Sequence, residues 1–480
     1  MVSLLFCLTH AASQGAAKEV TFTPAQLLAD LSIAKRALEE LHPGLTLHSS
    51  PEAMDDSFAE SRAFFQLPRS LNETHREFMR LTASVKCGHT HCNPYNQSAA
   101  NKAVFQSQLV LPFAFEWMGS RMAVTRDAEG KLPRGTEILE IGGKPVAELK
   151  ELMMRSARAD GANDSKRASL LSVYGSDLVE PFDLLLPALV RLNSGRIKIK
   201  ARLGEVVRQD LTVKLISVGE RAKNLKPKVS DDLTWKFRFL DADTALMTLP
   251  TFAVWESKQD WKGFLKESFE ELNSRQGSKL IIDVRGNEGG ADEVNLVLGQ
   301  WLASERISLP ATRFYVKYQK VSADLRPYLA TWDESFYDFS KEIEKEENGL
   351  YLLRQNLLNP RSVGPNAAAF KGPVALLVDS SCSSATYYLA RILQSSGRAK
   401  IVGRETGGSQ KGMTGGRIMF LTLPNTKIEF DIPLVLTRPA SPLPDQGVMP
   451  DMLVNREPAD LKSGRDKDIE AALKLLSGQS

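Results

Sequence analysis

The sequence of 480 residues has only four cysteines, and Cys7 lies within the first ten residues. So few cysteines in so long a chain exclude a disulfide framework as its main source of stability. It also lacks a run of about 20 uninterrupted apolar residues of the kind that spans a membrane. Charge of one sign is missing as well, because 61 Lys and Arg face 58 Asp and Glu. The net charge of +3 therefore predicts no nucleic-acid partner.

Three common motifs are also absent. The glycine-rich stretch Gly286–Gly290 does not have the G-x-G-x-x-G spacing of a dinucleotide-binding turn, and no Gly-Lys-Ser/Thr phosphate loop occurs. No serine stands in a G-x-S-x-G elbow, which argues against an esterase of the α/β-hydrolase class. Neither repeats nor low-complexity segments are found.

What is present indicates a large globular protein. Its length predicts two or three domains, and 42% hydrophobic with 25% charged residues is ordinary for a folded chain. Residues 1–18 are predicted to be a signal peptide, with a periplasmic or secreted location; the alternative is a frayed cytosolic terminus. In an oxidising compartment Cys87 and Cys92 are close enough in sequence to pair.

The chain divides into three parts by pattern. Residues 19–104 have helical spacing and helix-capping signals, residues 105–216 are rich in strand-forming residues, and residues 232–480 alternate strands and helices. The last part predicts an α/β catalytic domain with a mostly parallel sheet. We predict a linker from Ser217 to Asp231, and a helical, charged insertion over residues 322–369.

The middle part contains a recognisable order of elements. Between Pro133 and Leu149 a short strand is followed by the tight turn Gly142-Gly143 and then by a helix after Pro145. This order resembles a PDZ-like module, whose groove binds a peptide by strand addition. The alternative is a small β domain with no ligand.

Two apolar strands each end in an abrupt turn before a helix, in Lys279–Gly290 and Val374–Thr386. Groups at the carboxyl ends of buried parallel strands project into the crevice above the sheet. Ser384 then lies at a helix amino terminus and is the candidate nucleophile, unless the serines there are only capping residues. The candidate oxyanion-hole donors are the backbone N–H groups of Gly289, Gly290 and Ala385.

The candidate general base is His89, in a glycine-punctuated loop after a predicted helix. One alternative is a structural loop histidine. The other is a zinc site, whose ligands would be Cys87, His89, His91 and Cys92, although their spacing matches no usual pairing of ligands. We therefore predict no metal and no cofactor.

Several of these motifs together resemble the S41 family of serine peptidases, which includes the C-terminal processing (tail-specific) and tricorn proteases. The matching motifs are Leu41–Gly44, Cys87–Thr90, Gly135–Pro145, Leu280–Gly290, Ser383–Ala385, Val402–Gly408, Leu423–Asn425 and Gly447–Asp451. The resemblance implies a ClpP/crotonase-like catalytic domain and a serine endopeptidase that cleaves peptides or proteins through an acyl-enzyme on Ser384.

The resemblance also bears on the base and its acid. Tail-specific members use a lysine, for which Lys411 is the candidate, whereas tricorn-like members use a histidine that Gly88-His89-Thr90 matches; His89 is favoured. The acid that orients it is Asp445, or alternatively Glu405. The tricorn-like pattern has a serine where this chain has Gly88. A non-catalytic protein that binds peptides or hydrophobic ligands on the same scaffold is the remaining hypothesis.

Overall fold

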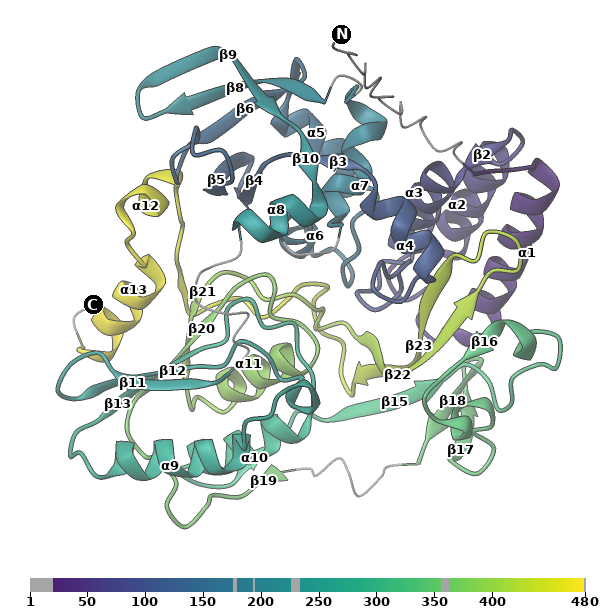
Figure 1. The fold of residues 1–480 in the computed structure, drawn as a ribbon. Helices are drawn as coiled ribbons and strands as arrows, with labels where there is room; N and C mark the ends of the chain where they lie inside the picture. The colour runs from purple at the N-terminus through teal and green to yellow at the C-terminus, as the bar shows by residue number, and fades with distance from the viewer. Residues whose placement is uncertain (1–19, 176–178, 193–194, 226–233, 355–361, 479–480) are drawn as a thin grey trace, which may run out of the picture.

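The computed structural model describes residues 20–175, 179–192, 195–225, 234–354 and 362–478. The predicted signal peptide and the second half of the predicted linker, residues 226–231, lie outside these ranges. Within them, no helix is both long and apolar enough to cross a membrane. Figure 1 shows the helical N-terminal part beside the middle part, with the strand-and-helix C-terminal part beneath both.

The N-terminal part is helical, as the sequence predicts. It consists of α1 (Pro24–Leu41), α2 (Pro51–Phe64), α3 (Leu71–Ser84) and α4 (Ala99–Gln106), with the short paired strands β1 (Thr21–Phe22) and β2 (Arg69–Ser70). Capping explains where the helices begin. Thr23 and Ser70 each form a capping box with the residue three positions on, and Ser50 accepts a hydrogen bond from the Ala53 N–H.

The middle part is built on an antiparallel sheet in the order β4-β5-β6-β8-β9. Its strands are β4 (Phe113–Met118), β5 (Arg121–Asp127), β6 (Glu137–Ile141), β8 (Arg196–Leu203) and β9 (Val206–Lys214). The predicted turn at Gly142-Gly143 is confirmed, because it joins β6 to β7 (Lys144–Pro145) ahead of α5 (Val146–Met154). The remaining elements are β3 (Leu109–Val110), α6 (Asp164–Leu170), α7 (Pro181–Leu189), β10 (Ile216–Ser217) and α8 (Val218–Leu225).

The C-terminal part contains the predicted sheet. Its order is β11-β12-β13-β20-β21-β24, and every pairing is parallel except that of β11 with β12. The strands are β11 (Lys236–Phe239), β12 (Thr244–Thr248), β13 (Lys279–Asp283), β20 (Val374–Val378), β21 (Lys400–Gly403) and β24 (Met452–Leu453).

Helices cover both faces of this sheet. The helices α9 (Trp261–Asn273), α10 (Glu293–Leu302) and α11 (Ala385–Ser395) share one core with residues such as Leu280 and Leu376. The helix α13 (Lys467–Leu476) packs on the other face with Ile281 and Leu377, and α12 (Pro458–Ser463) precedes it. Burial on both faces explains why β13 and β20 are continuous apolar runs.

A second six-stranded sheet corrects the prediction of a helical insertion over residues 322–369. Its order is β16-β22-β23-β15-β18-β17, and all its pairings are antiparallel. The strands are β15 (Thr312–Val316), β16 (Leu329–Ala330), β17 (Ile343–Glu347), β18 (Leu350–Leu353), β22 (Met413–Thr422) and β23 (Glu429–Pro439), and β14 (Ile307–Ser308) pairs separately with β19 (Ser362–Val363). Besides strands, the described part of the insertion has only short 3-10 turns.

The densest run of charge in the insertion, Glu344–Glu347, belongs to the edge strand β17. The Asn348-Gly349 turn, with φ of 54° and 73°, connects this strand to β18. Asn-Gly is a strong hairpin signal, but the charged residues before it led to the prediction of a helix. The predicted linker is likewise partly wrong, because α8 begins at Val218.

The long strands β22 and β23 share a core with α1 and α3, which joins the N-terminal part to the C-terminal part (Figure 1).

Candidate active site

Ser384 lies between β20 and α11 in an unusual backbone conformation. Its φ is 51° and its ψ is −128°, a region that residues with a side chain rarely occupy. Its side chain makes no capping hydrogen bond to the helix that follows, so the interpretation of Ser384 as a simple capping residue is not supported. The turn holds the serine at the amino end of α11, where backbone N–H groups and the helix dipole favour negative charge.

The glycine turn after β13 packs directly on this serine. A Cβ placed on Gly289 would lie 2.7 Å from the Cβ of Ser384, and one on Gly290 would lie 2.0 Å from the carbonyl carbon of Phe252. Asn287 ties the two turns together, because its Oδ1 accepts hydrogen bonds from the Gly289 N–H and the Thr386 hydroxyl, both at 2.9 Å. Glycine is therefore required at position 289 for the close approach.

The predicted oxyanion donors differ in their availability. The Gly289 N–H already donates to Asn287, which leaves it poorly placed to bind a second acceptor. No group in the described part of the chain accepts a hydrogen bond from the N–H of Gly290 or Ala385. These two N–H groups are the free donors beside Ser384.

Ser384 and His89 line one groove with a volume of about 1220 Å³. His89 comes from the loop after α3, and its imidazole lies against Gly415 of β22, where an added Cβ would be 3.3 Å from the ring Cε1. The groove walls also carry five cationic and three anionic side chains: Arg313, Lys341, Arg354, Arg391, Arg417, Asp292, Glu293 and Glu342.

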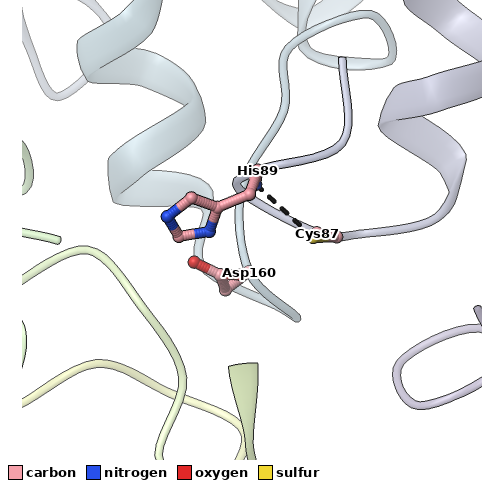
Figure 2. Close-up of side chains that lie close together, drawn as sticks. All are labelled: Cys87, His89 and Asp160. Carbon is pink, nitrogen blue, oxygen red and sulfur yellow. Dashed lines mark hydrogen bonds between the residues drawn. The ribbon is translucent and has the colours of Figure 1, made fainter. Parts of the chain in front are cut away.

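The His89 loop is held by a segment of the middle part that the sequence did not single out. The Arg158 guanidinium donates to the Gly88 carbonyl, the Asp160 carboxylate accepts from the Gly88 N–H at 2.9 Å, and the Gly161 N–H donates to the Lys86 carbonyl at 2.9 Å. Figure 2 shows the Asp160 carboxylate directed at the imidazole of His89.

Electrostatics favour a neutral His89. Burial lowers the pKa of His89, and the positive charges of Arg158 and Lys166 lower it further. The negative charges of Asp160 and Glu288 raise it. The ring Nδ1 is buried and has no hydrogen-bond partner among the described residues. A neutral imidazole is the form that accepts a proton.

Lys166 and Glu288 form a second connection between the middle part and the serine turns. The Lys166 ammonium is only 3% exposed and lies 2.6 Å from the Glu288 carboxylate, which is 51% exposed, and it also donates to the Ser381 carbonyl at 3.1 Å. Burial raises the pKa of Glu288, but Lys166 and Arg158 outweigh this effect and lower it to about 2.

Both predicted orienting acids form hydrogen bonds with groups other than His89. Asp445 accepts hydrogen bonds from the His48 ring at 3.1 Å and the Ser409 hydroxyl at 2.8 Å. Glu405 accepts from the Gly447 N–H at 2.9 Å and from the Ser165 hydroxyl at 3.3 Å. Both acids therefore tie loops together.

The alternative base Lys411 is exposed and is not among the residues that line the groove with Ser384. Lys166 is the lysine that the structure does bring to the serine turns, but its ammonium is bound to Glu288 and the Ser381 carbonyl. A lysine must lose its proton to act as a base, and a carboxylate partner stabilises the protonated form. The geometry thus favours His89 over either lysine.

Among the described residues, one set of metal-ligand types converges at the site. Ligand atoms of Cys87, His89 and Asp160 lie within 4.8 Å of one another, whereas His91 and Cys92 of the zinc hypothesis do not join them. Burial raises the pKa of the Cys87 thiol to about 11, and cationic side chains stand nearby, so the surroundings do not favour a metal cation. Cys87, Cys92 and Cys382 are free thiols, so the local disulfide is not formed.

Comparison with known proteins adds a family and a fold. The profile of peptidase family S41 matches residues 243–454. The structure of mature CPAF complexed with lactacystin has a TM-score of 0.65 at 15% identity, covering 95% of this chain and 99% of that one. A serine-to-alanine mutant of CPAF has a TM-score of 0.67 at 16% identity, with coverages of 94% and 96%. No curated protein shows a significant match to the sequence.

Proposed function

We propose that this chain, whose residues 243–454 match the profile of peptidase family S41, hydrolyses peptide bonds with Ser384 as nucleophile and His89 as general base. One observation carries the proposal. Ser384, held in a strained conformation at a helix amino terminus, opens into the same groove as a partly buried histidine whose environment keeps it neutral. Nucleophile, base and free oxyanion donors are the parts that acyl transfer needs.

The reaction follows from these parts. The Ser384 Oγ attacks the carbonyl carbon of the substrate while His89 takes the hydroxyl proton. The N–H groups of Gly290 and Ala385 stabilise the negative oxygen of the tetrahedral intermediate. As the C–N bond breaks, His89 returns the proton to the leaving amine. A water molecule, activated by His89, then hydrolyses the acyl-enzyme and releases Ser384.

The groove supports a polypeptide substrate. Its volume of about 1220 Å³ exceeds what a small ligand requires, and it runs beside the strands β15, β22 and β23. We propose endopeptidase activity, with the middle part acting as a PDZ-like module that presents peptide tails. Export to the periplasm or out of the cell is part of the same proposal and depends on residues 1–18.

A fluorophosphonate probe tests the mechanism, because it reacts with activated serines. We expect a single adduct by intact mass on the parent protein. The adduct should be lost in Ser384→Ala and His89→Ala and retained in Lys411→Ala. Loss of labelling in Lys411→Ala, with labelling kept in His89→Ala, would instead assign a serine-lysine dyad.

The same experiment addresses the non-catalytic hypothesis. A folded parent protein that gives no adduct and cleaves no denatured protein substrate would support a binding protein on this scaffold. Circular dichroism of each variant is the control, because it separates loss of chemistry from loss of fold.

A further inference from the structure

We propose that Asp160, from the middle part of the chain, is the positioning residue that orients His89 for the serine reaction. The inference rests on the proposed function. It replaces Asp445 and Glu405, which the sequence suggests for this role and which the structure engages elsewhere. A general base needs such a partner, because the carboxylate fixes the ring orientation and stabilises the imidazolium that forms.

The geometry of the His89 ring supports this role. An Asp160 oxygen and a His89 ring nitrogen lie within 4.8 Å of each other, and Figure 2 shows the carboxylate facing the ring. The buried Nδ1 has no hydrogen-bond partner among the described residues. The separation from Asp160 is longer than a hydrogen bond, but catalytic hydrogen bonds are often long in a free enzyme and shorten when substrate binds. Asp160 can then accept a hydrogen bond from Nδ1–H, which leaves Nε2 to serve Ser384.

Asp160 is itself held in place by its surroundings. Only 3% of the residue is exposed, and its Oδ1 accepts the Gly88 N–H, the peptide adjacent to His89. Arg158 binds the carbonyl of the same glycine, so hydrogen bonds on both sides of this residue connect the loop that carries the base to the segment that carries the acid. A positioning group must be fixed in this way before it can fix another.

The position of Asp160 also explains why residue 88 is a glycine. A Cβ at this position would lie 2.6 Å from the Asp160 Oδ2, too close for any side chain. The carboxylate thus occupies the space that the serine of the tricorn-like pattern would need. The glycine at position 88 therefore makes room for Asp160, which gives His89 a polar neighbour from a different part of the chain.

The surrounding charges agree with this role. Four charged groups act on His89: Asp160 and Glu288 raise its pKa, whereas Arg158 and Lys166 lower it, along with burial. The Cys87 thiol also lies beside the ring. A metal bound by Cys87, His89 and Asp160 is the competing interpretation of the same cluster, but it would have to overcome Arg158 and Lys166 and would consume the base.

The test compares the second-order rate of fluorophosphonate labelling across pH 4 to 9 in the parent, Asp160→Asn, Asp160→Glu and Asp445→Asn. We expect Asp160→Asn to lower the rate by about 10²- to 10⁴-fold, as for loss of an orienting acid. Its acidic limb should also move to lower pH, because the variant loses a charge that raises the pKa of His89. Asp160→Glu should recover part of the rate and return the limb toward its original position.

Asp445→Asn is the matched control. This variant removes a carboxylate that binds His48 and Ser409 and not His89. The acidic limb of its labelling profile should therefore lie at the same pH as that of the parent. A shifted limb in Asp445→Asn together with an unshifted one in Asp160→Asn would overturn the inference.

The possible failures are distinguishable. A parent protein that is not labelled at Ser384 contradicts the proposed function itself. A parent that is labelled, with Asp160→Asn folded by circular dichroism and labelled at the parental rate and pH, contradicts only the inference. Loss of parental labelling on dialysis against a chelator, with recovery on adding Zn²⁺, would replace the positioning role with a metal site.

Discussion

The two sides of the groove are built differently. The nucleophile side comes from two short turns, after β13 and β20, on neighbouring strands of one sheet, and these turns contact each other directly. The base side combines a loop after α3, a segment of the middle part and a strand of the second sheet. The first side is built on one sheet, with Lys166 of the middle part bound to both turns, whereas the second depends on the mutual docking of three parts of the chain.

Because of this difference, mutations are expected to affect the two sides of the groove in different ways. A change in the nucleophile turns acts through steric contact, because backbone and Cβ atoms touch there. A change on the base side acts through charge, because Asp160, Arg158, Lys166 and Glu288 all bear on His89. The predictions below separate these two kinds of effect.

On the nucleophile side, the largest effect is expected for Gly289→Ala. The new methyl group would meet the Ser384 Cβ at 2.7 Å and displace the nucleophile, and misplacement by about 1 Å costs roughly 100-fold in rate. Fluorophosphonate labelling measures the loss. Gly286→Ala is the control, because its φ of 81° is also positive, as is the φ of 110° at Gly289, while nothing lies within 4 Å of the added carbon. Equal losses in both variants would refute the steric account.

At the ion pair that connects the two sides, we expect Glu288→Gln to destabilise the protein more than Lys166→Met. The first leaves the buried Lys166 ammonium without its partner, and the second removes the ammonium altogether. Breaking a fully buried pair costs about 3–5 kcal/mol, so a half-exposed partner suggests about 1–3 kcal/mol for Glu288→Gln. Urea unfolding followed by fluorescence gives both values. The reverse order would show that the pair is solvated.

A smaller, favourable effect should accompany Ser384→Gly. Glycine adopts the observed φ of 51° without the strain of a side chain, which is worth about 1–3 kcal/mol, less the entropy of the more flexible unfolded chain. A net gain of about 1 kcal/mol in unfolding free energy is therefore expected. Ser384→Ala, which keeps the Cβ, is the comparison; if it is stabilised equally, the backbone is not strained.

The smallest expected effect is on pH. Because burial lowers the pKa of His89, the base stays neutral below the pH at which an exposed histidine would gain a proton. Labelling of Ser384 should therefore persist at pH values below about 6.5 and fall only in more acidic buffer. An acidic limb centred above 6.5 would show that Asp160 and Glu288 together outweigh burial and the neighbouring cations.

The same contrast explains what the sequence could predict. The strands β13 and β20 were predictable because burial on both faces leaves a continuous apolar run, and Ser384 follows from its place between strand and helix. The hairpin at Asn348-Gly349 was predictable in principle, but its charged strand lies at a sheet edge and resembles a helix surface.

The acid of the base side was not predictable. Asp160 lies 72 positions from Gly88, with which it bonds, and no periodicity or motif links a loop after one helix to a loop after another. The acids that motifs did suggest, Asp445 and Glu405, proved to be partners of His48, Ser409 and Gly447 N–H. Spacing along a chain reports local structure, whereas docking between parts reflects shape and charge at surfaces distant in sequence.

The missing side chain at Gly88 has an evolutionary consequence. Because a Cβ there would lie 2.6 Å from the Asp160 Oδ2, a side chain at position 88 would require the Asp160 carboxylate to shift or to be replaced by a smaller group. A lineage that gained a serine at 88 is therefore expected to change at 160 as well. The two positions should therefore covary among descendants of a common ancestor, and the middle part of one such protein could not be exchanged for that of another without its matching loop.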